Sequence, residues 1–128
     1  MDIELFCLCD GAFNYNGKLT IVGTYDQLRI ASIPMTVRVS IALKLNVPLN
    51  DLSNNSRIVL SFKDAHGNQV APDVVNEVST IPQNAAVIHL AMAVSVELNI
   101  SELGPHRILL SFNNNLIKTK DFSIVLRQ

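Results

Sequence analysis

The chain has 128 residues, of which 48% are hydrophobic and 16% are charged, and its formal net charge at pH 7 is −1. This length is typical of one domain that buries a core without needing a disulfide or a metal, so we expect residues 1–128 to form a single domain. A nearly neutral chain lacks the clustered positive charge with which proteins bind nucleic acid, so we expect no nucleic-acid partner.

The sequence bears on cellular location through its targeting signals and through the redox state of its cysteines. Asp2 and Glu4 lie where a secretory signal carries basic residues, and the uncharged stretch at 78–96 contains proline and polar residues that disfavour a membrane span. Cys7 and Cys9 lie two residues apart in one predicted strand, where a disulfide would distort the extended backbone. We therefore predict free thiols, a cytoplasmic location and no membrane partner.

The first predicted element is an N-terminal hairpin. Its first strand alternates, with one face made of Ile3, Leu5, Cys7 and Cys9 and the other of Glu4, Phe6, Leu8 and Asp10. We expect the cysteines to pack as small apolar side chains beside Ile3 and Leu5. A polar turn at 14–17 leads into a second strand over 18–30, in which Gly23 indicates a bulge or a close backbone approach.

The clearest strands are residues 35–47 and 86–98. In each of them an apolar side chain occupies every second position, and polar or small side chains occupy the positions between. A strand with one buried and one solvated face has this period, whereas helical spacing would scatter the apolar residues around a cylinder. The predicted core shared by the sheets consists of Val39, Ile41, Leu43, Leu60, Phe62, Leu90, Met92, Val94, Leu110 and Ile124.

Residues 57–64 predict a strand that turns through Ala65-His66-Gly67-Asn68, where glycine is available for positive φ, into a short returning strand at 70–75. Residues 73–79 have the composition of a single helical turn.

The last predicted hairpin joins a strand that begins at Gly104-Pro105 to a final strand at 116–126, through the turn Asn113-Asn114-Asn115. Seven to eight strands with regularly spaced turn signals predict an all-β fold. We expect an antiparallel β-sandwich of immunoglobulin-like or jelly-roll-like topology.

The motif Phe6-Cys7-Leu8-Cys9-Asp10-Gly11-Ala12, followed by Gly17-Lys18-Leu19-Thr20-Ile21-Val22-Gly23-Thr24-Tyr25-Asp26, resembles a family of short bacterial proteins of unknown function. The resemblance continues in the proline-preceded strand from Met35 and in the Gly-Pro-His-Arg-Ile-Leu-Leu-Ser-Phe segment, and it spans nearly the whole chain. It implies a compact β-sandwich. Because no activity is established for that family, the resemblance transfers no catalytic residue.

No grouping of residues matches a catalytic or metal-binding motif. A cysteine nucleophile needs an exposed thiolate of low pKa beside an oriented base, which mid-strand cysteines do not offer. Cys7, Cys9 and Asp10, even together with a histidine from elsewhere in the chain, lack the ligand spacing of structural zinc sites. We predict no enzyme activity, no catalytic residue, no metal and no cofactor.

Our first hypothesis is a non-enzymatic binding or protein-interaction module that associates with itself or with another protein. The high hydrophobic fraction predicts that apolar surface remains after one core is filled. On the outer face of strand 86–98, His89, Ala91 and Ala93 replace the charged side chains that a solvated strand normally carries, so we predict the interface there. The other explanation is that a loop, or the segment 73–79, covers this face within the same chain.

The alternative hypothesis is a protein that binds a small ligand or a metal at one end of the sandwich. Loops at sandwich ends often carry function, and Asp10, Tyr25 and Asp64 fall at predicted strand ends.

Overall fold

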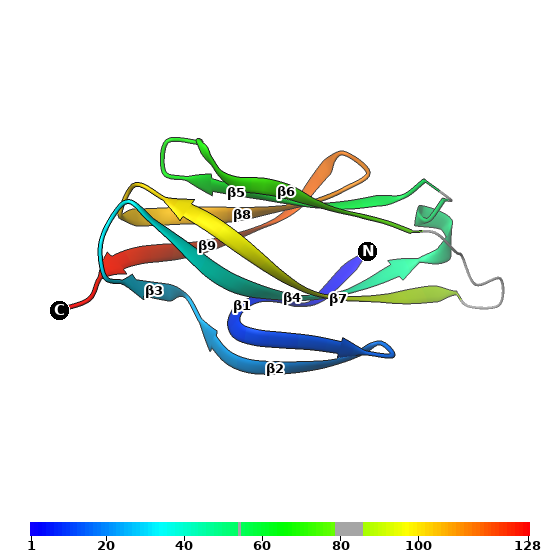
Figure 1. Cartoon of the computed structure of the whole chain (residues 1–128). Helices are drawn as coiled ribbons and strands as arrows, with labels where there is room; N and C mark the ends of the chain where they lie inside the picture. The colour runs from blue at the N-terminus through cyan, green and yellow to red at the C-terminus, as the bar shows by residue number, and fades with distance from the viewer. Residues whose placement is uncertain (54, 79–85) are drawn as a thin grey trace.

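The computed structural model describes residues 1–53, 55–78 and 86–128, and this part of the chain is built almost entirely of strands (Figure 1). The strands, in chain order, are β1 (Asp2–Tyr15), β2 (Lys18–Tyr25), β3 (Gln27–Ile30), β4 (Met35–Pro48), β5 (Arg57–Asp64), β6 (Gln69–Glu77), β7 (Val87–Ile100), β8 (Gly104–Phe112) and β9 (Asn115–Leu126). A short 3-10 turn, Leu49–Asp51, follows β4. Among the described residues no helix is long and apolar enough to cross a bilayer.

The described strands form two sheets with the order β2-β1-β4-β7 and β3-β9-β8-β5-β6. Their inner faces pack against each other around one hydrophobic core, so the predicted all-β sandwich is confirmed. Leu90 and Val94 are half-buried at the margin of this core, and the other predicted core residues are buried. Period-2 alternation therefore identified the inward face of most strands correctly.

One predicted strand, residues 18–30, is divided in the structure. It breaks at Asp26 into β2 of the first sheet and β3 of the second, where β3 pairs in parallel with β9. The described residues therefore contain nine strands where about seven to eight were expected, and the pair β3–β9 is the parallel exception among otherwise antiparallel described pairs. The core-facing positions change phase at this corner, from odd-numbered Tyr25 in β2 to even-numbered Leu28 and Ile30 in β3, as the chain passes from one sheet to the other.

The predicted face of the cysteines was also wrong. The pairing of β1 with β4 shifts between Ile3 and Leu5, and this one-residue shift moves every later side chain of β1 to the other face. Leu8 therefore packs in the core, while Cys7 and Cys9 point away from it. Cys9 is nevertheless fully buried, and its Sγ lies 3.7 Å from the Ser40 carbonyl oxygen.

A third layer explains why side chains on the outer face are buried. The far half of the β1–β2 hairpin lies across the outer face of β4 and β7 (Figure 1). Ser40 and Ala42 on that face of β4 are buried, and the side-chain amide of Asn14 donates a hydrogen bond of 3.0 Å to the Ala91 carbonyl oxygen. The hairpin closes at Asn16 and Gly17, whose φ values of 52° and 80° suit a tight turn.

Residues 73–77 do not supply this cover. Residues 73–77 belong to β6, which pairs with β5 in the other sheet, and residue 79 lies outside the described part of the chain. The expected helical turn was therefore wrong for residues 73–77. The two other predicted hairpin turns are confirmed, at Gly67 with φ 81° and at Asn113 and Asn114 with φ 49° and 68°.

Candidate functional site

Asp10 and Tyr25, two of the residues predicted to bind a ligand, lie close together on β1 and β2. Burial raises the pKa of Tyr25 to about 12, and the charge of the Asp10 carboxylate contributes to this shift. Asp10 also lies over Gly23, where φ is 65° and an added Cβ would collide with the carboxylate. The predicted close backbone approach at Gly23 is confirmed, and it explains why glycine occupies this position.

Asp64, the third predicted ligand residue, belongs to the second sheet and has other contacts. Its Oδ1 accepts hydrogen bonds of 2.9 Å from the backbone N–H groups of His66 and Asn68. Burial acts to raise the pKa of Asp64, but these N–H groups outweigh it and hold the pKa below its usual value. The Asp64 carboxylate therefore stabilises the β5–β6 turn. It lies in a different sheet from the Asp10–Tyr25 pair.

Asp64 has two neighbours that the sequence analysis did not associate with it. The ligating atoms of Asp64, His66 and Glu102 all lie within 4.8 Å of one another, and His66 Nδ1 is 2.8 Å from Glu102 Oε2. In the neighbouring strand, His106 is buried opposite Asp64; its Nδ1 lies 3.0 Å from the Gly104 carbonyl oxygen, and its Nε2 has no partner among the described residues. Two carboxylates and an imidazole are suitable ligands for a divalent cation.

The predicted interface residues lie on β7, which forms one edge of the first sheet. The β4–β7 pairing runs along the whole of β7, and the Leu49 N–H donates to the Ala86 carbonyl oxygen at 3.0 Å. In an antiparallel pair the backbone groups of alternate residues point toward the partner strand. Even-numbered residues of β7 therefore bond to β4. Odd-numbered residues direct their N–H and C=O groups to the other side, where the described residues place no strand and which is called the free edge.

The side chains of β7 leave this edge unusually uncharged. Over its 14 residues the strand carries a single Asp, Glu, Lys or Arg side chain, that of Glu97, and it has no proline. His89 is exposed and its ring bonds to Asn46, whereas Ala91 and Ala93 are half-buried under the β1–β2 hairpin. The structure thus brings the three predicted interface residues together on one edge strand.

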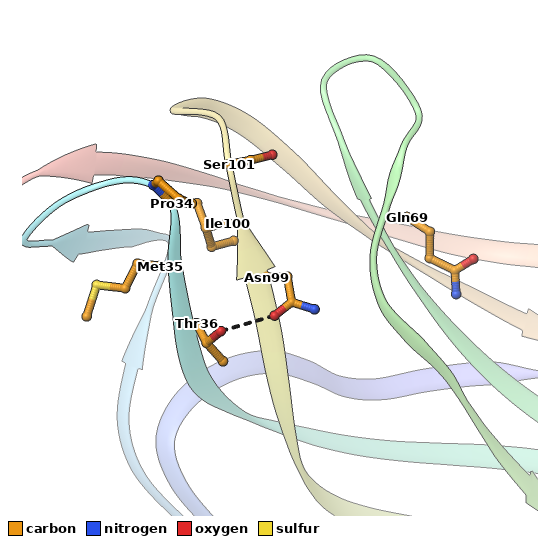
Figure 2. A pocket seen from close by; sticks show the side chains of 7 residues that line it. All are labelled: Pro34, Met35, Thr36, Gln69, Asn99, Ile100 and Ser101. Atoms are coloured by element: carbon orange, nitrogen blue, oxygen red, sulfur yellow. Dashed lines mark hydrogen bonds between the residues drawn. The ribbon is translucent and has the colours of Figure 1, made fainter.

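A seam runs between the β7 edge and the β6 edge of the other sheet. Three hollows follow one another along it, with volumes of about 510, 390 and 200 Å³, and each is lined by residues of both strands. Figure 2 shows the largest of the three, which is lined by Gln69 on β6 and by residues at the end of β7, and in which Thr36 donates a hydrogen bond of 3.1 Å to Asn99. The seam exposes the partly buried inner side of β7, including Leu90.

The DUF6941 family of unknown function matches residues 4–125 of the chain. The chain belongs to this family. No curated protein matches the chain. Because the description of DUF6941 names no activity, any function has to be inferred from the residues and their geometry.

One exposed group of this DUF6941 domain was missed by the sequence analysis. The outward face of the β1–β2 hairpin carries Phe13, Tyr15 and Val22, which are 65%, 75% and 55% exposed. The available signal was that Phe13 and Tyr15 share one face of the hairpin while Ala12 and Asn14 share the other, which covers β4 and β7.

Proposed function

We propose that this domain is a non-enzymatic protein-interaction module that binds an extended segment of another polypeptide along the free edge of β7. The observation that carries the proposal is a long edge strand whose alternate backbone groups point outward and whose side chains include one charge. Strand addition to such an edge forms main-chain hydrogen bonds, which supply affinity. Natural edge strands that avoid contacts usually carry lysine, proline or a bulge.

The side chains of β7 support the same mode of binding. On the inner side, Leu90 and Val94 are half-buried, so an added strand with alternating apolar residues would cover them and fill the neighbouring hollows. Burial of apolar surface contributes about 25 cal/mol per Å². The backbone bonds and this apolar contact would therefore act together along the same strand.

The state of the cysteines supports a module without a thiol nucleophile. Burial raises the pKa of the Cys9 thiol, and the neighbouring Cys7 adds to this shift. An activated cysteine needs the opposite shift and access to a substrate. The free thiols and the sequence resemblance also support placing the module in a bacterial cytoplasm.

The test compares proline substitutions on the two edges of the seam. Ala93→Pro removes an N–H that points to the free edge of β7 and leaves the bonds to β4 in place. Val75→Pro is the matched control, because the Val78 N–H bonds to the Ser56 carbonyl oxygen and the register places Val75 outward on β6. Tagged wild type and both variants, checked for folding by circular dichroism, are incubated with lysate of the native host.

The captured proteins are then identified by mass spectrometry. The proposal predicts a partner that binds the wild type and the Val75→Pro variant but not Ala93→Pro. Equal capture by the wild type and Ala93→Pro would contradict it.

A second candidate function is binding of a divalent cation by Asp64, His66 and Glu102. The specific observation in its favour is the convergence of three ligating atoms from the β5–β6 turn and the segment before β8. Elemental analysis of protein purified without chelators, followed by calorimetric titration with zinc chloride, tests it. Binding should be lost in a His66→Ala, Glu102→Gln double variant and kept in His89→Ala, the control histidine. The absence of binding by the wild type would reject this candidate.

A further inference from the structure

The sequence of β7 is complementary to itself when it is read in the antiparallel direction. We propose that the segment bound at the β7 edge is β7 of a second copy of this chain, paired antiparallel about a twofold axis through Ala93. This proposal rests on the proposed function, because it uses the same edge. It joins the two four-stranded sheets into one continuous sheet across the dimer.

The register follows from the direction of the backbone groups. Odd-numbered residues of β7 point to the free edge, so hydrogen-bonded pairs between two copies must join odd to odd residues. The odd residues run from Val87 to Asn99, and Ala93 is their midpoint. Centring the pair on Ala93 therefore uses the whole edge, whereas any other centre leaves part of each strand unpaired.

Charge selects the same centre. About Ala93, the exposed Glu97 of one copy lies opposite His89 of the other, and the twofold axis forms this pair twice. Moving the centre to Ser95 would place Glu97 opposite Ala93, and moving it to Ala91 would carry Glu97 beyond the start of the other β7. An acidic side chain opposite an imidazole is a favourable cross-strand pair, particularly when the imidazole is protonated.

The inner face is complementary as well. Even-numbered residues meet even-numbered residues on the core side, and each of these pairs is apolar: Ile88 with Leu98, Leu90 with Val96, and Met92 with Val94. Leu90 and Val94 are the half-buried members of the predicted core. The second copy would cover both, which supplies the contact that one domain alone leaves incomplete.

The hairpin contact at the edge is compatible with this pairing. Asn14 donates to the Ala91 carbonyl oxygen, and Ala91 faces Ser95 of the second copy in the proposed register. A carbonyl oxygen has two lone pairs, so the Ser95 N–H of the second copy can donate to the same oxygen while Asn14 stays bound.

Disulfide trapping tests the register. Opposed residues of a hydrogen-bonded antiparallel pair have Cα atoms about 5.5 Å apart, within the span of a disulfide. Ala93→Cys faces its own counterpart across the axis and should form a covalent dimer under mild oxidation. Ser95→Cys is the matched control, because Ser95 of the second copy is four residues away along the strand, about 13 Å, and should form none.

Mixing the Ala91→Cys and Ser95→Cys variants should produce a cross-linked pair that neither variant forms as efficiently alone. The native cysteines are present in every sample and give the background. Failure of Ala93→Cys to cross-link, or equal cross-linking by Ser95→Cys alone, would overturn the proposed register.

Light scattering over a range of protein concentrations tests the dimer itself. The wild type and Val75→Pro should dimerise, and Ala93→Pro should be monomeric. His89→Glu places like charges opposite each other twice and should weaken dimerisation on the order of tenfold. Adding Glu97→Lys to it restores opposite charges and should recover most of the loss.

Failure of the self-pairing and failure of the proposed interaction module would give different results. A wild type that stays monomeric at every concentration, while Ala93→Pro still abolishes capture of another protein, overturns the self-pairing and leaves the interaction module intact. A dimer that Ala93→Pro leaves unchanged and that Phe13→Ser with Tyr15→Ser dissolves overturns the self-pairing and places the contact on the outer face of the hairpin.

Discussion

The two strands that border the seam, β6 and β7, differ in the features that prevent an exposed sheet edge from pairing with another strand. β6 contains Pro72, carries the carboxylates of Asp73 and Glu77, and pairs with β5 through register shifts. Each of these features discourages another strand from pairing there. β7 is longer, pairs with β4 in unbroken register and has none of them except Glu97 near one end. This difference is the reason why we propose the β7 edge, and not the β6 edge, as the interface.

The same contrast appears within β7, between its face and its edge. The outer face is partly covered by the chain's own β1–β2 hairpin, which leaves Ala91 and Ala93 half-buried. Small side chains there fit beneath the hairpin. The uncharged pattern seen in the sequence thus has a contribution from intramolecular packing. Among the described residues, Asn14 binds one outward backbone group of this edge, the Ala91 carbonyl oxygen.

The largest effect is expected from truncating a core leucine beside β6 and comparing it with one on β7. Leu60→Ala in β5 should lower the free energy of unfolding by about 2–5 kcal/mol, because this side chain is fully buried. Leu90→Ala should cost roughly half as much in the monomer, since Leu90 is half-buried. Denaturant unfolding at low protein concentration measures both. Equal losses would show that the β7 margin is packed as fully as the interior.

Proline at adjacent positions of β7 should separate its bonded side from its free side. Met92→Pro removes an N–H directed at β4 and should cost about 1–3 kcal/mol, because it breaks a ladder hydrogen bond and leaves a β4 carbonyl group without its donor. Ala93→Pro removes an outward N–H and should have a clearly smaller effect. Thermal unfolding of the two variants compares them. A larger loss for Ala93→Pro would reverse the assignment of the free edge.

Removing the proline and a carboxylate from β6 should allow its edge to pair with another strand, as we propose for β7. Pro72→Val combined with Asp73→Val supplies the backbone N–H that proline lacks and removes a carboxylate that accepts hydrogen bonds of 2.8 Å from Ser61 and 3.1 Å from Gln69. The variant should assemble beyond a dimer as concentration rises, as measured by light scattering. Asp121→Val, which removes an exposed carboxylate away from this edge, serves as the control and should not assemble further.

Asn14→Ala tests how firmly the hairpin is held over β7. The substitution removes the bond to the Ala91 carbonyl oxygen and the bond of 3.0 Å that the Gly17 N–H donates to Asn14 Oδ1. We expect a loss of about 1 kcal/mol in unfolding free energy. Hydrogen exchange should become faster in β2 and the end of β1 and stay unchanged in β5. Unchanged exchange in the hairpin would mean that apolar contacts alone hold it.

The smallest effect is a pH dependence of the turn that leads into β6. Because the folded-state pKa of Asp64 is lowered, the stability it contributes is present above the usual carboxyl pKa and is lost as pH falls through the lowered value. Asp64→Asn should therefore have a lower thermal midpoint than the wild type at neutral pH, and the two should converge in acid. A difference that persists unchanged at low pH would assign the effect to geometry instead of charge.

Local pattern determined much of this protein. Alternation between apolar and polar residues fixed which segments are strands, and asparagine and glycine fixed three of the turns, because both signals depend on neighbours only a few residues apart. The same pattern marked His89, Ala91 and Ala93 as an unusual outer face. It also identified Ile41 and Leu60 as core residues.

Tertiary structure decided the rest, because strand pairing joins residues far apart in the chain. The shift between Ile3 and Leu5 exists only in relation to β4, and it reversed the face of Cys9. Asp64 was grouped with Asp10 and Tyr25 from its place near a turn, yet its sheet put it beside His66 and Glu102. That β7 is an edge strand, with outward backbone groups, depends on which strands occupy its two sides, and alternation within a single strand carries no information about that.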